Sequence, residues 1–269
     1  MGCRVGGYRL TASSLEILPM RLFRSLAVLF ILSVVLPLHA QDLAATCHAS
    51  SSYDVTLHAD SVIFDRAAPA PLRVELQQGV LHTDGAAVRL NAEDKDRLAL
   101  FERDLRALAP RVRTVAQNGV DLAVQALRTE AGGMGLGADT RAEFDRHLAA
   151  DARELKQRIA TSNSSHDWQG DAANRYANQI AADLLPLLAG DLGRQAIDAA
   201  MSGDLQAAAD LRDRAAGLAT SLQPRLQQRM QALRPQVEAL CPSIRHLAEL
   251  QQGVRGSNGQ PLNLLQIGR

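Results

Sequence analysis

The chain has 269 residues, of which 46% are hydrophobic, so it is long enough to bury a substantial core as one large domain or two small ones. Its 29 basic residues balance its 29 acidic residues. A nucleic-acid-binding surface would show as a clustered basic excess, and the composition gives no indication of that class of function.

Residues 20 to 40 have the layout of a secretory signal peptide. A short basic start at Met20 precedes an apolar run at residues 26 to 36, and a small residue, Ala40, follows after a breaker. The run is too short to span a bilayer, which needs about 20 apolar residues. We therefore expect residues 1–40 to be a leader region cleaved after Ala40. Translation is expected to start at Met20, although a start at Met1 stays open.

Two cysteines remain after the expected cleavage site. Cys47 lies just beyond it and Cys241 lies near the end of the chain, whereas Cys3 falls in the leader. Exported proteins fold in oxidising compartments, so a Cys47–Cys241 disulfide is predicted. The alternative is a pair of unpaired, buried thiols.

The stretch from residue 41 to 92 has the pattern of β-strands. Leu72, Val74 and Leu76 alternate with polar residues, and Asp84-Gly85 is a strong signal for a two-residue hairpin turn. The pattern predicts an antiparallel β-meander of four or five short strands with one apolar face. Such a sheet needs a second layer to cover that face.

Residues 93 to 252 change to a helical period and predict five or six packed α-helices. Pro110 is expected to end the first helix, the glycine-rich stretch 132–137 to separate two others, and Pro186 and Pro235 to kink helices. The last predicted helix carries an apolar seam made of Leu222, Leu226, Met230, Leu233, Val237 and Leu240.

Together these patterns predict an α+β fold in a single domain over residues 41–252. Residues 253–269 contain four glycines and a proline and are expected to form a flexible C-terminal tail. Its short apolar end could add an edge strand or fold back onto the sheet.

Several short motifs resemble the YggN-like family of uncharacterised bacterial periplasmic proteins. They are Cys47-x5-Tyr53-Asp-Val-x-Leu57, Leu81-x-x-Asp84-Gly85-x-x-Val88-x-Leu90, Leu105-x-x-Leu108-x-Pro110-x-Val112 and Ala116-x-x-Gly119-Val120-x-Leu122. The similarity is clearest over residues 47–130. The resemblance implies export to the periplasm and a strand-then-helix layout, and it carries over no catalytic residues.

Three groups of residues were weighed as reactive or binding sites. The glycines of 132–137 follow a helix and lack a lysine, so a helix end is favoured over a phosphate loop. Residues 164–167 (Ser-Ser-His-Asp) are neighbours in sequence, whereas members of a catalytic triad converge from separate elements, so a polar loop is favoured. His58 and His82 could be neighbours in the sheet and share a metal. They lack the His-x-x-x-His spacing that places two imidazole rings on one face of a helix.

These considerations assign no catalytic, metal-binding or cofactor-binding residue, and whether the chain is an enzyme stays open, with the balance against it. The leading hypothesis is a non-enzymatic periplasmic protein that binds a protein or an apolar envelope component through a helical face. The alternatives are a hydrolase with dispersed catalytic residues and a purely structural module of the envelope.

Overall fold

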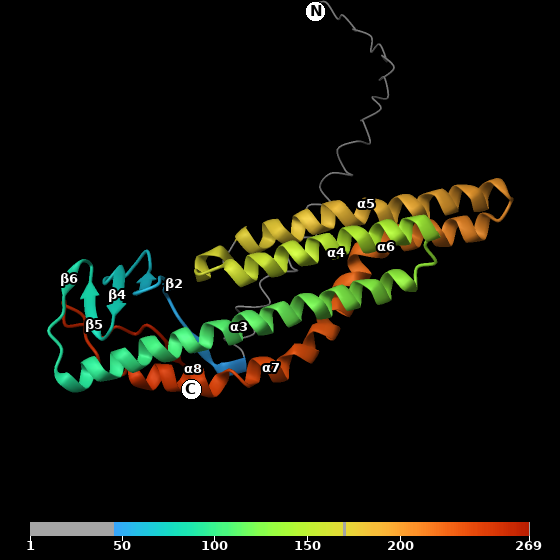
Figure 1. Ribbon diagram of the computed structural model, residues 1–269. Helices are drawn as coiled ribbons and strands as arrows, with labels where there is room; N and C mark the ends of the chain where they lie inside the picture. The colour runs from blue at the N-terminus through green and yellow to red at the C-terminus, as the bar shows by residue number, and fades with distance from the viewer. Residues whose placement is uncertain (1–45, 169–170, 269) are drawn as a thin grey trace, which may run out of the picture.

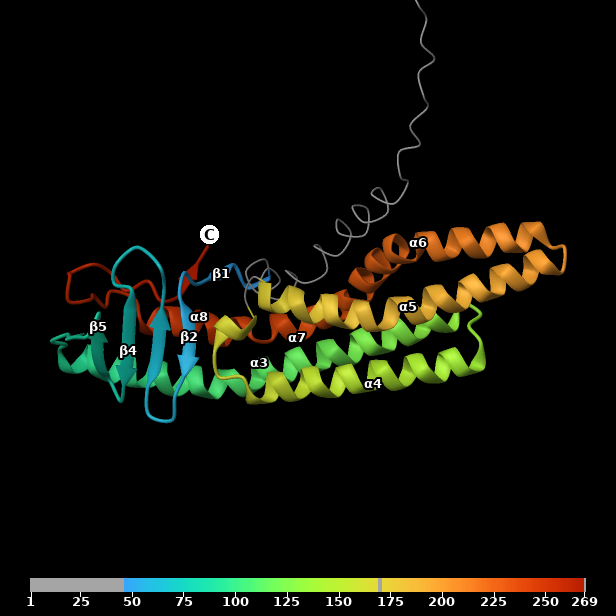
Figure 2. The same cartoon turned by 90° about the horizontal axis from the view of Figure 1, so that it is seen from above.

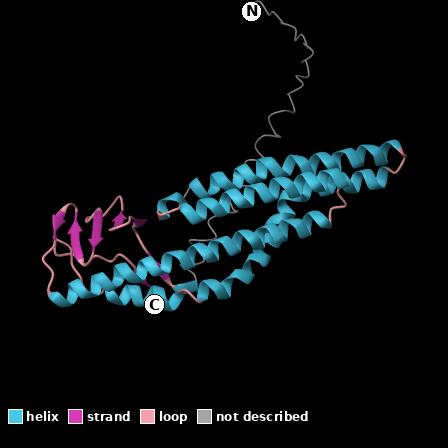
Figure 3. Cartoon of the chain, in the orientation of Figure 1, coloured by secondary structure: helices cyan, strands magenta, loops and turns pink. Residues whose placement is uncertain are grey.

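The computed structural model describes residues 46–168 and 171–268. Strands gather at one end of an elongated molecule and long helices form the remainder (Figures 1 and 3). This arrangement confirms the predicted α+β fold with an N-terminal antiparallel sheet followed by packed helices. The expected leader lies outside the described residues.

The sheet is an antiparallel meander of five strands in the order β2-β3-β4-β5-β6. The strands are β2 (Asp54–Leu57), β3 (Val62–Asp65), β4 (Arg73–Gln77), β5 (Val80–Thr83) and β6 (Ala86–Ala87). Register places Phe64 opposite Val74, and Leu76 opposite both Val62 and Leu81. All five of these side chains are buried, because the two-residue period puts them on the same face of the sheet.

Helix α3 (Ala92–Gly132) covers that face and then continues far beyond the sheet (Figure 1). Its 41 residues correspond to about 60 Å of helix. Pro110 lies inside it, so the prediction that the helix ends there is wrong. The missing amide hydrogen bond is outweighed because α3 packs on both sides of Pro110, with Phe101 and Leu108 buried before it and Ala126 after it.

Three further long helices complete the other end of the molecule. They are α4 (Ala138–Thr161), α5 (Asp171–Met201) and α6 (Leu205–Met230). With the second half of α3 they enclose a hydrophobic cluster, here called the bundle core, made of Ala131, Leu136, Phe144, Leu148, Leu184, Leu188, Leu192 and Leu218. The glycine-rich stretch separates α3 from α4 as predicted, and Asp204 caps α6 by accepting a hydrogen bond from the amide of Ala207.

The final helical region differs from the single kinked helix that the apolar seam predicted. The chain passes from α6 through a 3₁₀ turn (Gln231–Leu233) into α7 (Arg234–Glu238) and α8 (Cys241–Leu250). Pro235 and Pro242 lie in the first turns of α7 and α8, where proline is tolerated because no helical amide bond is lost. The prolines therefore start new helices, and Leu233, Val237 and Leu240 still point inward and are buried.

The two ends of the described chain meet beside α8, where they form a separate two-stranded sheet. Cys47 and Cys241 form a disulfide with a Cα–Cα distance of 5.1 Å, in agreement with the predicted pairing. Strand β1 (Ala49–Ser50) pairs with β7 (Gln266–Ile267), and Val254, Leu262 and Leu264 are buried. These contacts differ from the expected flexible tail and match the alternative of a segment folded back onto the sheet.

A second hydrophobic cluster, here called the sheet core, joins the sheet to the first part of α3, to α8 and to the two ends of the described chain. It contains Cys47, Ala49, Tyr53, Val62, Phe64, Val74, Leu76, Leu81, Leu98, Phe101, Leu108, Leu240, Cys241, Ile244, Leu247, Leu250, Val254, Leu262 and Leu264. Helix α3 is the element that contributes to both cores.

Polar contacts fix α3 against the elements that surround the sheet core. The buried Glu102 carboxylate accepts a hydrogen bond from the amide of Gln78 at 2.8 Å and pairs with Arg106 at 2.9 Å. Gly79 adjoins this contact with φ of +80°, and a Cβ there would lie 2.7 Å from the Lys95 carbonyl oxygen. The turn between β4 and β5 can therefore approach α3 this closely only with glycine at that position.

Candidate functional site

The polar loop after α4 forms part of the sheet edge. Ser164 bridges to Thr56 of β2, and the amide of Leu57 donates to the carbonyl of Asn163 at 2.8 Å. The Ser165 hydroxyl accepts a hydrogen bond from the amide of Val55. The polar loop predicted for residues 164–167 is in part a short 3₁₀ helix (Ser165–Trp168), and this connection covers the outer edge of β2.

The serine and histidine of this loop do not form a catalytic pair. The Asp54 carboxylate lies 3.0 Å from Nδ1 of His166 and 3.4 Å from Oγ of Ser165. No hydrogen bond joins the Ser165 hydroxyl to the His166 ring among the described residues. Because a triad needs the histidine between the serine and the carboxylate, this order of contacts cannot activate Ser165 as a nucleophile.

The two histidines weighed as metal ligands are separated by the sheet itself. His58 follows β2, whereas His82 lies on β5 opposite Glu75, and two strands intervene. Within residues 46–168 and 171–268, no group of three or more histidine, cysteine or acidic residues is arranged to hold a metal ion.

A carboxylate of the protein itself lies at the start of α4, beside the glycine-rich turn. The buried carboxylate of Asp191 on α5 accepts hydrogen bonds from the amide of Gly137 at 2.9 Å and the Thr140 hydroxyl at 2.9 Å. Arg194 and Gln195 donate to the same carboxylate. Burial raises the pKa of Asp191, but these four donors together outweigh it and hold the pKa below its usual value. Asp191 thus occupies the position that a phosphate would need.

A second carboxylate between α4 and α5 is poorly satisfied. Oδ2 of Asp151 is buried and makes no hydrogen bond to any described residue. Burial raises the pKa of Asp151, and the nearby charge of Asp183 adds to the effect, while His147 opposes it. The Asp151 carboxyl group therefore binds a proton more readily than an ordinary aspartate does.

The most unusual surface is the tip of the α5–α6 hairpin. Ile197 and Met201 at the end of α5 are 61% and 82% exposed, and Leu205 at the start of α6 is 72% exposed. Figures 1 and 2 both show this hairpin reaching past the turn that joins α3 to α4. Large apolar side chains this exposed indicate an interaction surface when they lie together, and Ile197 and Met201 share one helix face at i, i+4 spacing.

Sequence analysis predicted the helical layer but missed the apolar tip. The signal was present, because Met201 and Leu205 directly flank the stop and restart of the helices. The apolar seam predicted from the sequence contains Leu233, and this residue is only 5% exposed.

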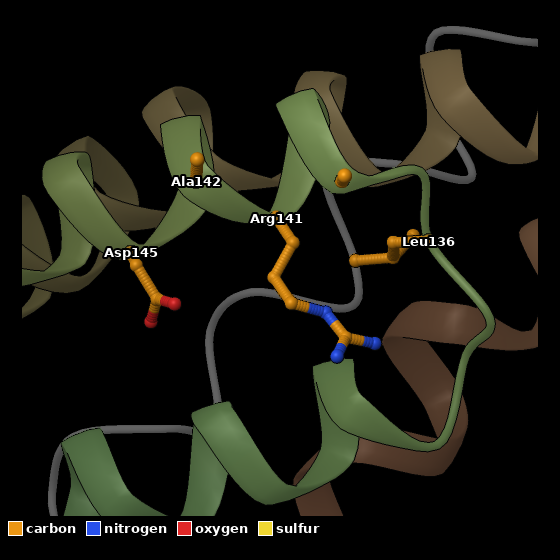
Figure 4. Close-up of a pocket in the computed structure, with 5 residues that line it drawn as sticks. Leu136, Arg141, Ala142 and Asp145 are labelled. Atoms are coloured by element: carbon orange, nitrogen blue, oxygen red, sulfur yellow. The ribbon is translucent and has the colours of Figure 1, made fainter.

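A shallow, open pocket of about 430 Å³ lies beside the α3–α4 turn at the same end of the molecule. Leu136, Ala138 and Ala142 supply apolar lining, and Figure 4 shows the Arg141 side chain extending across the opening toward α3. Asp145 at the other end of the pocket is paired with Arg128 of α3 at 2.9 Å. Arg141 makes a 3.4 Å hydrogen bond to the Gly132 carbonyl and has no carboxylate partner in the described part of the chain.

A family model for proteins of unknown function, DUF2884, matches residues 47–265. The chain belongs to this family. The expectation of an uncharacterised family is thus confirmed. Neither a curated protein nor a solved structure gave a match.

The matched region of this DUF2884 member includes both cores, the disulfide, the hairpin tip and the pocket. In the described residues, no helix combines the length and apolar character needed to cross a membrane.

Proposed function

We propose that this chain is an exported periplasmic protein that binds another protein, or an apolar component of the envelope, without catalysing a reaction. The observation that carries the proposal is the apolar hairpin tip of Ile197, Met201 and Leu205, all more than half exposed. Exposure of apolar surface to water is unfavourable, and burial of this surface against a partner would lower the free energy.

Export is supported by three features. Residues 20–40 have the pattern of a cleavable signal peptide, and the YggN-like resemblance implies a bacterial periplasmic location. The Cys47–Cys241 disulfide suits an oxidising compartment. Intact mass of protein recovered from the periplasm should correspond to a chain that begins at Gln41, and a mass that retains residues 20–40 would contradict cleavage.

The binding role is tested by chemical crosslinking in the periplasm followed by purification of the tagged chain. The double variant Ile197→Ser/Met201→Ser should lose captured partners, since it removes two of the three apolar side chains of the tip while leaving both cores untouched. Val80→Ser is the matched control, because Val80 is an exposed apolar residue at the sheet end of the molecule.

Flotation with vesicles of a neutral phospholipid, run beside the crosslinking, tests the apolar-component form of the same proposal. Equal capture and equal flotation by wild type and the tip variant, with unchanged thermal melts, would overturn the proposed function. The described residues offer no specific observation that favours the hydrolase alternative.

A further inference from the structure

The hairpin tip and the Arg141 pocket lie at the same end of the bundle but cannot meet within one molecule. Gln195 donates to the Gly135 carbonyl at 3.1 Å and Asp191 holds the amide of Gly137, so this part of α5 lies beside the α3–α4 turn. Met201 follows Asp191 by ten residues, or about 15 Å of helix. Figures 1 and 2 show the tip projecting beyond the α3–α4 turn. The pocket adjoins that turn, so the tip projects beyond the pocket as well.

The two surfaces have complementary charge. Asp198 lies between Ile197 and Met201 in sequence, and its exposed carboxylate has no partner in the part of the chain that the structure describes. Asp204 adds a second carboxylate at the tip, and residues 195–211 contain no lysine or arginine. The pocket offers the reverse, a guanidinium without a carboxylate partner at Arg141 above an apolar lining.

We infer that the partner of the hairpin tip is a second copy of this chain, whose Arg141 pocket receives the tip and pairs with Asp198. This inference deepens the proposed function and rests on it, since it names an occupant for the same tip. A two-fold axis places each tip in the pocket of the other copy, because both surfaces lie at one end of the molecule. The contact then closes as a dimer instead of extending into a filament.

The charge pair gives a direct test by sedimentation equilibrium of the purified chain. Wild type forms a dimer in a concentration-dependent way. Asp198→Arg and Arg141→Glu each weaken the dimer by at least roughly ten-fold, because each places like charges opposite one another. The double variant Asp198→Arg/Arg141→Glu recovers most of the affinity, since the pair is restored with its signs exchanged.

Arg146→Glu is the matched control for the charge change. Arg146 is an exposed arginine on the same helix, outside the pocket, and its replacement leaves the dimer as strong as in wild type. None of these side chains lies in either core, and thermal melts verify that each variant folds.

Three outcomes would overturn the inference. The first is a wild-type chain that stays monomeric at concentrations on the order of 100 µM, far above a micromolar Kd. The second is a double variant that dimerises as weakly as the single variants. The third is binding of neutral phospholipid vesicles through the tip in place of a second copy. A monomeric wild type whose tip variant still loses its crosslinked partner would refute self-association alone and leave the proposed function standing.

Discussion

The sheet half and the helical half of this molecule are stabilised in different ways. The sheet core joins aromatic rings, a disulfide and the returning C-terminal segment, with ring centroids of Tyr53, Phe64 and Phe101 spaced at 6.3 and 6.0 Å. The bundle core is built almost wholly from leucine, with Phe144 as its only aromatic residue among those described. The covalent link is confined to one half, whereas the exposed apolar tip belongs to the other.

This difference indicates a division of roles along one long helix. The sheet half fixes both ends of the described chain, and its exposed large apolar residues are at most 47% exposed, whereas the bundle ends in a hairpin whose three apolar residues are at least 61% exposed. We propose that the two halves nevertheless form a single domain, because α3 supplies side chains to both cores.

Removing the disulfide is expected to have the largest effect. The bond closes a loop with a sequence separation of 194, and in the chain-entropy model Cys47→Ala/Cys241→Ala loses up to about 5 kcal/mol of unfolding free energy. Urea denaturation measures the loss. If the halves form one domain, hydrogen exchange should rise in both; a rise confined to residues 54–83 would show that the sheet half unfolds separately.

Leu233→Ala is expected to cost about 2 to 5 kcal/mol, the usual range for a buried leucine. Leu233 is buried in the 3₁₀ turn where the chain passes from α6 to α7, so it joins the end of the bundle to the elements that enter the sheet core. Leu205→Ala is the matched control and should change stability by less than about 0.5 kcal/mol, because Leu205 is exposed. Equal thermal midpoints for the two variants would contradict the burial of Leu233.

Asp191→Asn should destabilise the bundle by about 1.5 to 3 kcal/mol at neutral pH, the range for hydrogen bonds to a charged group. An amide offers one acceptor oxygen to four donors, and its NH₂ group would oppose the Gly137 amide or Gln195. Because the folded-state pKa is lowered, this stability is present above the unfolded-state pKa and is lost as pH falls through the folded-state pKa. Thermal melts against pH should show that acid destabilises wild type more than the variant.

Asp151→Asn should have the smallest effect, with the opposite sign. The buried Oδ2 atom of Asp151 has no described hydrogen-bond partner, so removing its charge should stabilise the protein by about 1 kcal/mol at neutral pH. Its folded-state pKa is raised, so its contribution favours folding at low pH and is lost as pH rises through that value. A variant less stable than wild type at pH 7 would show that the carboxylate has a partner that the structure does not reveal.

The sequence predicted those features that depend on short-range periodicity. Alternation such as Leu72-Val74-Leu76 and the Asp84-Gly85 turn identified the meander, and the helical stripes identified the layer that covers it. The disulfide followed from compartment and count. Apart from the disulfide, each of these inferences uses residues whose neighbours in sequence determine their conformation.

The features that sequence analysis missed depend on contacts between distant segments. Pro110 remains helical because the same helix packs in two cores, and residues 162–165 pair with β2 although they follow α4. Asp191 reaches Gly137 across 54 positions, a contact that no local pattern encodes. The exposed tip could not be predicted because apolar periodicity indicates burial. Met201 is exposed because α5 extends beyond the turn that joins α3 to α4 (Figure 1).

The cover over β2 has a consequence for aggregation. An edge strand with free amides and carbonyls is a template on which a strand from another chain can add. The Leu57 amide is already bonded to Asn163, and the Val55 amide to the Ser165 side chain, so strand addition at this edge must first displace the loop. At the opposite edge, β6 is only two residues long and offers little length for pairing. Mutations that detach the loop, such as Ser165→Pro, would therefore promote fibril formation by exposing the edge of β2, even where they lower the folding stability only a little.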